Sequence, residues 1–411
     1  MKEYAGLFRP SEPNINSCKG KDKNLTRAPS FRFFRQKHKN LLDLSDKNNI
    51  FANDWAEQNA LKSPDDKHNI ISMKKPAKVD VAVLLLFFNR PETFRQVFEQ
   101  VRKARPSRLL LYQDGPRGER DMAGIKACRE IAEQIDWECE VHRNYQEKNY
   151  GCDPSGYMSH KWAFSLADKC IVLEDDVVPS QSFFPFCKEM LDRYEHDERI
   201  GMIAGFNTDE TTADCPYDYF YTSTFSIWGW ASWRRVVDKW DGEYTFMEDS
   251  YNMRQLESLV KARNYRNSMV KAFRDHRDSG KAYFESIFQA ALLFNSQFAV
   301  MPSRNLINNV GFSGEGTHYS TLLNLMPKRL RKMFTMKRYE IDFPIKHPKY
   351  VIDNVEYKER LYRINAWNHP WIKIRYSLEE FWLNLKAGNI ENITRSLRRR
   401  ISKWMGKYKH A

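Results

Sequence analysis

Hydrophobic and polar residues alternate in blocks between residues 79 and 176, and these blocks predict strands that alternate with helices. The longest apolar run, 81–88, is bounded by polar turns, as expected for a strand buried on both faces of a sheet. Pro91 suits the first turn of a helix, and apolar positions at helical spacing follow it over 92–103. The same reasoning predicts strands over 108–112, 139–144 and 170–173 and helices over 123–134 and 156–166. This alternation predicts an α/β fold with a mostly parallel sheet flanked by helices.

The rest of the chain divides into three parts by its pattern. Residues 1–77 are polar and basic and form an extension with little core of its own, whereas 78–325 hold the predicted α/β domain. Further elements of that domain are predicted as helices over 182–194 and 283–294, strands over 201–205 and 298–301, and an aromatic-rich segment over 217–233. Residues 326–411 are predicted to form a separate, basic, helical C-terminal tail.

Two helices are predicted in this tail. Ser377 and Glu380 have the spacing of a capping box, and Gly388 ends the helix that follows. The second helix, over 390–409, has an apolar face, and from Arg395 onward the chain holds seven Lys and Arg and no acidic residue. A basic helix with a tryptophan on its apolar face fits binding in the plane of an anionic membrane. Nucleic acid is the competing partner, but no nucleic-acid-binding module accompanies the charge, so we expect none to bind; a merely solvated helix is the third interpretation.

Composition supports an anionic partner and a cytoplasmic location. The chain has 66 Lys and Arg against 53 Asp and Glu, a net charge of +13. Its seven cysteines include no C-x-x-C pair, which favours reduced thiols over a zinc cluster or a disulfide framework. There is no secretory signal, and the longest apolar run is far shorter than the ~20 residues that cross a bilayer. We therefore predict a cytoplasmic protein that contacts the inner face of the cell membrane peripherally.

Acidic residues follow two of the predicted strands. Glu174, Asp175 and Asp176 come directly after the strand over 170–173, and Asp114 follows the strand over 108–112. Ligands of open parallel sheets bind at the carboxyl ends of the strands, so these side chains and Asn89 are expected along one edge. Adjacent carboxylates repel unless a cation neutralises them, and Mg²⁺ or Mn²⁺ prefers such oxygen ligands. The triplet thus predicts a metal site that holds a diphosphate, although an isolated triplet of this kind is also typical of a solvated turn.

Six short segments, in this order, carry a resemblance to a known family. They are FNRP at 88–91, DGP at 114–116, NYGC at 149–152, LEDD at 173–176, IWGWASWR at 227–234, and NVGF at 309–312 with Thr317 and His318. Together they resemble the nucleotide-diphospho-sugar transferase superfamily of GT-A fold. Within it, the chain is similar to bacterial polysaccharide-type glycosyltransferases related in pattern to N-acetylglucosaminyltransferase I. The resemblance covers about 240 of the 411 residues, and it implies a GT-A (Rossmann-like) fold.

The resemblance implies the residues that bind the donor. Asn89 and Arg90 are expected to line the nucleotide pocket, and Asp114 to hold the uracil or ribose. From the residues alone, Asp114 could instead cap the turn at Gly115. Glu174 and Asp175 are expected to contact the ribose and the donor sugar.

The resemblance also implies which residue binds the metal. Asp176 is expected to be the principal ligand of Mn²⁺ or Mg²⁺. His318 is a second candidate near the metal or the diphosphate, because imidazole suits Mn²⁺ better than Mg²⁺; the alternative is a loop histidine with no ligand.

Enzymes of this pattern are mostly inverting, and they need a carboxylate that takes the proton of the acceptor hydroxyl. Glu285, at the start of the helix over 283–294, is our candidate for this base, with Asp209 and Asp278 as rivals. Relatives often have an aspartate after the aromatic residue, whereas this chain has Phe284 and then Glu285. A glutamate favoured by the helix dipole is the alternative interpretation.

The aromatic segment is the candidate acceptor wall. Trp228, Trp230 and Trp233 could present flat faces to an acceptor sugar, with Arg234 near the diphosphate, or they could belong to the core.

The sequence therefore predicts a glycosyltransferase that moves a sugar from a nucleotide-diphosphate donor, with a UDP-sugar favoured, to a glycan or lipid-linked acceptor in bacterial surface polysaccharide synthesis. A sugar nucleotidyltransferase is one alternative, but it should have a glycine-rich phosphate loop where this chain has residues 89–92 (NRPE). A non-catalytic carbohydrate-binding or membrane-active protein on a transferase scaffold is the other.

Overall fold

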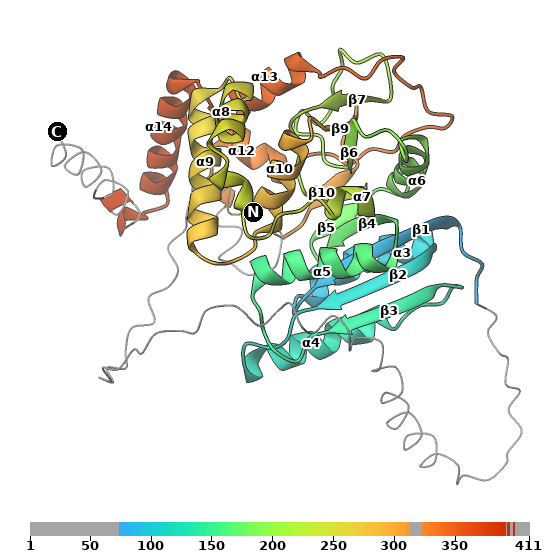
Figure 1. Ribbon diagram of the computed structural model, residues 1–411. Helices are drawn as coiled ribbons and strands as arrows, with labels where there is room; N and C mark the ends of the chain where they lie inside the picture. Colours follow the sequence, from blue (N-terminus) through green and yellow to red (C-terminus); the bar gives the residue numbers. More distant parts are fainter. Residues whose placement is uncertain (1–73, 312–322, 392, 395–397, 399–411) are drawn as a thin grey trace, which may run out of the picture. The chain divides into compact units, whose positions relative to one another are not determined.

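The computed structural model describes residues 74–311, 323–391, 393–394 and 398, and these described residues belong to one compact unit. Its centre is an eight-stranded sheet in the order β3-β2-β1-β4-β8-β6-β9-β7 (Figure 1). The strands are β1 (Val79–Phe87), β2 (Pro106–Gln113), β3 (Glu140–Tyr145), β4 (Lys169–Glu174), β6 (Ile200–Ala204), β7 (Tyr219–Thr222), β8 (Trp230–Trp233) and β9 (Phe298–Pro302). A second, two-stranded sheet pairs β5 (Val177–Pro179) with β10 (Ile307–Asn309).

The strand directions confirm the predicted fold class. β1 pairs in parallel with both β2 and β4, β2 with β3, and β6 with β9. β8 is antiparallel to β4 and β6, and β7 is antiparallel to β9. The molecule is thus an α/β protein with a mostly parallel sheet flanked by helices, consistent with a Rossmann-like GT-A fold.

The central strands are buried on both faces because helices cover both sides of the sheet. Val83 and Leu84 of β1 are fully buried. The side chains of β8 identify the two faces, since Trp230 packs on one side and Trp233 on the other. Trp230 lies against His160 and Phe288, and the Nε1–H of Trp233 donates to the main-chain oxygen of Leu191.

The predicted helices form close to their predicted bounds. They are α3 (Pro91–Ala104), α4 (Glu119–Ala132), α5 (Cys152–Leu166), α6 (Phe183–Arg193) and α10 (Phe284–Phe294). His160 belongs to α5 and Phe288 to α10, whereas Leu191 belongs to α6. α5 and α10 therefore cover one face of β8 and α6 covers the other.

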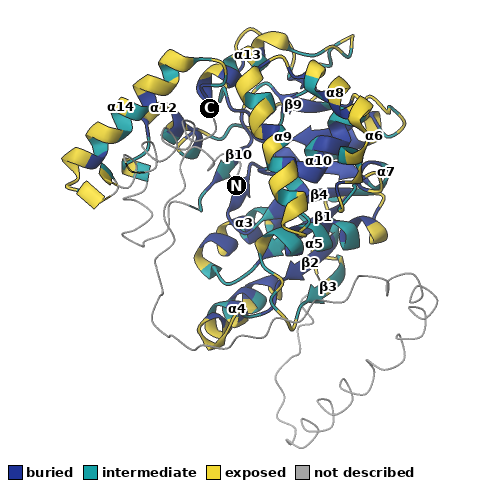
Figure 2. Ribbon diagram, turned by 60° about the vertical axis from the view of Figure 1, so that its left-hand side comes forward, coloured by how far each residue is buried: buried dark blue, intermediate teal, exposed yellow. Residues whose placement is uncertain are grey.

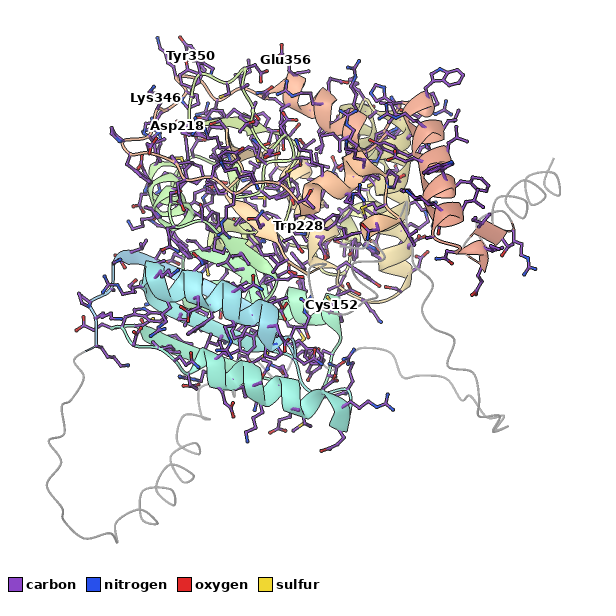
Figure 3. The ribbon with its side chains drawn as sticks, turned by 180° about the vertical axis from the view of Figure 1, so that it is seen from behind. Cys152, Asp218, Trp228, Lys346, Tyr350 and Glu356 are labelled. Carbon is purple, nitrogen blue, oxygen red and sulfur yellow. The ribbon has the colours of Figure 1, made fainter. Side chains whose placement is uncertain are left out.

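Residues 326–391 belong to the same compact unit, which corrects the expected domain boundary. The segment contains α12 (Lys328–Arg331), α13 (Val355–Ile364) and α14 (Pro370–Lys386). Its main chain bonds to the sheet-bearing part, for example from Lys346 N–H to the Asp218 carboxylate at 2.6 Å, and these two residues lie together in Figure 3. Arg360 Nε also donates to Asp209 at 2.7 Å.

The predicted capping box is wrong, because Ser377 and Glu380 lie inside α14 rather than at its start. The helix begins seven residues earlier at Pro370, which is favoured at a first helical position. Gly388, with φ of +69°, follows its end as predicted. Most of the second predicted helix, over 390–409, lies outside the described residues.

Two further observations concern cysteines and membranes. The six described cysteines are free thiols: Cys128, Cys139, Cys152, Cys170, Cys187 and Cys215. Within the described ranges, no helix has both the length and the apolar character needed to span a bilayer.

Candidate functional site

The acidic triplet lies at the carboxyl edge of the sheet, between the end of β4 and the start of β5. Asp175 and Asp176 are buried, at 4% and 0% exposure, whereas Glu174 is partly exposed. The two aspartates are buried at this edge because the apolar strands before and after them, β4 and β5, pack in the core. Burying two adjacent carboxylates is costly unless a cation compensates them.

Arg90 supplies that compensation in this structure. It follows β1, the neighbour of β4, and its Nη1 lies 3.0 Å from Asp176 Oδ2. Its Nε donates to Asp175 Oδ2 at 3.4 Å, and its Nη2 pairs with the other oxygen of Asp175. Burial lowers the pKa of Arg90, but the two carboxylates outweigh it and raise the pKa above its ordinary value. The sequence-based prediction placed Arg90 at the nucleotide; the structure places it on the carboxylates expected to hold the metal and the sugar.

Asp176 retains one oxygen for a further ligand. Its Oδ1 is buried, and no hydrogen-bond partner for it occurs in the described part of the chain. Gly311 closes over the other oxygen, since a Cβ there would lie 2.3 Å from Oδ2. In the residues that the structure describes, no group of three or more His, Cys, Asp and Glu is arranged to hold a metal by itself. The orphaned Oδ1 of Asp176 fits a hard cation such as Mg²⁺ only as a single protein ligand, so the other ligands of such an ion would not come from these side chains.

Glu285 lies in the first turn of α10. Burial raises the pKa of Glu174, and the charges of Asp176, Glu285 and Asp175 raise it further. The charge of Glu285 therefore acts on Glu174, although the two residues lie far apart in the sequence. Both rival bases pair with arginines: Asp209 accepts from Arg360 at 2.7 Å, and Asp278 pairs with Arg277 at 3.4 Å.

Asp114 organises the loop that leads into α5. Its carboxylate accepts from the main-chain N–H of Gly115 (2.9 Å), Tyr150 (3.0 Å) and Gly151 (2.9 Å), and from Asn149 Nδ2 (3.1 Å). Gly115 is needed here because a Cβ would lie 2.5 Å from the backbone of the facing loop. The ligand role predicted for Asp114 stays a prediction. These hydrogen bonds show that Asp114 caps the turn at Gly115.

Asn89 is held by Asp121, which Arg117 in turn holds in place, and neither residue was predicted from the sequence. Its Nδ2 donates to Asp121 Oδ1 at 2.6 Å, and the Nε of Arg117 donates to Asp121 Oδ2 at 2.8 Å. The hydrogen bond from the Arg117 side chain lowers the pKa of Asp121 to about 2. The only signal for this pair was the i, i+4 spacing at the start of α4, which is common on any helix.

The three tryptophans of the predicted acceptor wall, Trp228, Trp230 and Trp233, belong to the core. Trp230 is fully buried between His160 and Phe288, with ring centroids at 5.2 and 4.9 Å, so the expectation that its face meets an acceptor is corrected. Trp228 is 7% exposed and packs on Phe206 and Phe334; Figure 3 labels it.

Arg234 lies at the wrong end of the sheet for the role predicted for it. Its neighbour Trp233 pairs with Lys169 at the start of β4, while Glu174 is at the end of that strand. Arg234 Nη1 lies 3.0 Å from Asp168. The antiparallel direction of β8 therefore corrects the expectation that Arg234 approaches the diphosphate. His318 lies outside the described residues.

A hollow of about 570 Å³ has Asn309 and Val310 in its wall. The N–H of Val310 donates to the main-chain oxygen of Asp176 at 2.8 Å, which connects this wall to the acidic triplet. Arg95 and Arg338 line the hollow from α3 and from the C-terminal segment, and Glu99 of α3 adds one negative charge.

No protein-family profile and no curated protein sequence matches this chain. Among solved structures, mouse xyloside xylosyltransferase 1 in its apo form is 10% identical over 53% of this chain and 84% of that chain, with a TM-score of 0.29. A mycobacterial protein is 12% identical over 43% of this chain and 60% of its own, with a TM-score of 0.24. The inositol-1-phosphate CTP transferase from T. maritima is 12% identical over 39% and 74%, with a TM-score of 0.24. Similarities of this size carry no argument about function.

Proposed function

We propose that this protein is a metal-dependent, inverting glycosyltransferase that moves a sugar from a nucleotide-diphosphate donor, a UDP-sugar being favoured, to a glycan or lipid-linked acceptor. The observation that carries the proposal is the buried Asp176, which keeps Oδ1 available beside Asp175 and Arg90 at the carboxyl edge of the sheet. The proposed location is cytoplasmic and peripheral to the inner face of the cell membrane, in surface polysaccharide synthesis.

The residues divide into three roles. Asp176 would hold Mn²⁺ or Mg²⁺ through Oδ1, and the ion, when bound, supplies positive charge that stabilises the departing diphosphate. Arg90 adds a second positive group beside it and keeps Asp175 and Asp176 in place. In this proposal Glu285 takes the proton of the acceptor hydroxyl; its position in the first turn of α10 and the effect of its charge on Glu174 support this role.

Asp176→Asn tests this function. Thermal shifts with UDP-, GDP- and dTDP-sugars, each with and without Mn²⁺, should show one donor that raises the Tm of the wild type only when metal is present. Asp176→Asn should lose this shift and the metal-dependent hydrolysis of that donor. Asp168→Asn, at the opposite end of β4, is the matched control and should keep both.

Other outcomes would favour the alternatives. Release of pyrophosphate from a nucleoside triphosphate and a sugar 1-phosphate would identify a nucleotidyltransferase. Carbohydrate binding that a chelator leaves unchanged, with no donor turned over, would identify a non-catalytic protein. Either result contradicts the proposed transferase.

A further inference from the structure

The outer face of α14 carries an exposed apolar stripe. Trp371, Leu378 and Trp382 are 81%, 64% and 61% exposed. Including these three, six exposed apolar side chains recur every three to four residues along the helix: Trp371, Ile374, Leu378, Phe381, Trp382 and Leu385. This spacing places them on one side of the helix. Figure 2 shows exposed residues along the length of α14.

The opposite face of α14 attaches the helix to the rest of the molecule. Tyr376 is buried, and its hydroxyl donates to the main-chain oxygen of Ile364 at 3.0 Å. Asn384 is buried two turns further along. Glu379 accepts from the N–H of Lys328 at 2.8 Å and so joins α14 to α12. These contacts of the inner face fix the orientation of α14, so that the apolar stripe faces away from the core.

A cationic hollow of about 500 Å³ lies beside the stripe, between α12 and α14. Five basic residues and one acidic residue line it: Lys328, Arg329, Arg331, Lys332 and Arg375, with Glu379. Lys332 pairs with Glu210 at 3.0 Å. In the part of the chain that the structure describes, Arg329, Arg331 and Arg375 have no carboxylate partner. Arg375 comes from α14 itself, four residues after Trp371, so cations and apolar side chains occupy one surface.

We infer that this surface, formed by α12 and the outer face of α14, binds an anionic lipid membrane. Lipid phosphates complement the basic hollow, while the tryptophans and leucines enter the boundary between headgroups and acyl chains. A nucleic acid would account for the cations but not for six exposed apolar side chains. A second copy would bring an identical cationic surface against this one, and like charges repel. The inference names the surface for the membrane contact proposed above, yet it does not depend on catalysis.

Flotation of the full chain with lipid vesicles tests whether this surface binds an anionic membrane. The wild type should float with vesicles of 30% phosphatidylglycerol in phosphatidylcholine and remain unbound with phosphatidylcholine alone. Arg329→Ser with Arg375→Ser should weaken the partition about 25-fold, at about fivefold for each cation near the surface. Trp371→Ser with Trp382→Ser should weaken it at least tenfold.

A matched control changes exposed apolar side chains elsewhere. Tyr350 and Ile352, at 67% and 72% exposure, lie outside α14, so Tyr350→Ser with Ile352→Ser should float like the wild type. Unchanged flotation of either α14 double variant, or equal binding to phosphatidylcholine alone, overturns the proposal. So does sedimentation analysis in which the tryptophan variant abolishes a dimer. Binding to a DNA or RNA oligonucleotide that needs the cations but not the tryptophans also overturns it. Loss of flotation with an intact donor-dependent thermal shift would separate this surface from the proposed catalytic site.

Discussion

At the residue scale, the central feature is the pair of buried aspartates whose charge is compensated by Arg90. Arg90→Gln leaves Asp175 and Asp176 without that cation, so the metal-free variant should lose about 1–3 kcal/mol of unfolding free energy, a range that allows for the 41% exposure of the guanidinium. Urea unfolding measures the loss. Mn²⁺ should raise the Tm of this variant more than that of the wild type, because the guanidinium charge no longer repels the ion and no longer neutralises the two carboxylates.

Arg102→Gln is the control for this prediction. Arg102 pairs with Asp136 at 3.0 Å on the surface, so its loss should cost less than about 1 kcal/mol and leave the Mn²⁺ shift unchanged. If Arg90→Gln and Arg102→Gln unfold alike, Arg90 is not the counter-ion that stabilises the two aspartates.

His160 is a second residue with a measurable consequence. It is buried in α5 and stacks on Phe284 and Trp230, with ring centroids at 4.4 and 5.2 Å. Burial lowers its pKa to about 4, whereas an unfolded histidine titrates near ~6.5. Between these values the unfolded chain binds more protons, so stability falls as the pH drops through this window.

His160→Phe should remove this part of the pH dependence. Between pH 7 and pH 5 the wild type should lose about 2 kcal/mol more unfolding free energy than the variant, measured by urea titration at both pH values. His142→Gln, which changes a more exposed histidine beside Glu140, should keep the slope of the wild type. An identical slope in His160→Phe and the wild type would show that the buried ring is not the acid-sensitive group.

At the scale of elements, long apolar runs and helical spacing were enough to locate β1, β2, β4, α3 and α10. Buried parallel strands consist almost wholly of apolar residues, and that pattern is local in the sequence. β8 was missed because its four residues are buried by helices on both sides and resemble any aromatic core segment. β5 and β10 have three residues each, too few to show a period. α9 (Arg263–Asp278) buries only Met269 and Phe273, so its apolar face is too narrow to indicate a helix.

The helix starts show how local signals mislead. The capping-box spacing of Ser377 and Glu380 is real, but α14 runs through both residues from Pro370. Such pairs also occur within helices, where the i, i+3 neighbours face the same side. For Glu285, by contrast, the position in the first turn of α10 was predicted, whereas the effect of its charge on Glu174 depends on the tertiary structure.

At the scale of the whole molecule, residues 326–391 complete the fold rather than form an appended tail. Tyr357 of α13 is buried against Phe220 of β7, with ring centroids at 4.9 Å, and its hydroxyl accepts from the N–H of Thr208 at 3.3 Å. Tyr357→Ala should therefore lower the unfolding free energy of the compact unit by about 3–5 kcal/mol.

Urea unfolding followed by near-UV circular dichroism measures this effect. The variant should unfold in a single transition at lower urea, because the segment and the sheet share one core. Tyr350→Ala, an exposed aromatic residue in the same segment, should leave the midpoint unchanged. A separate early transition, with the rest of the molecule as stable as in the wild type, would identify an independent C-terminal domain.

The sequence by itself determined the fold class and the position of Glu174, Asp175 and Asp176 at a strand end. The spacing of apolar residues and the polar residues that follow an apolar run are local properties of the chain, so they can be recognised without a structure. Only the tertiary structure decided that Arg90 pairs with Asp175 and Asp176, and that Arg234 lies at the far edge of the sheet. Both depend on strand order and direction, which arise from packing between residues distant in sequence. The tertiary structure alone also decided that the apolar stripe of α14 faces outward. A helical period shows that one face is apolar but not whether that face meets the core or the solvent.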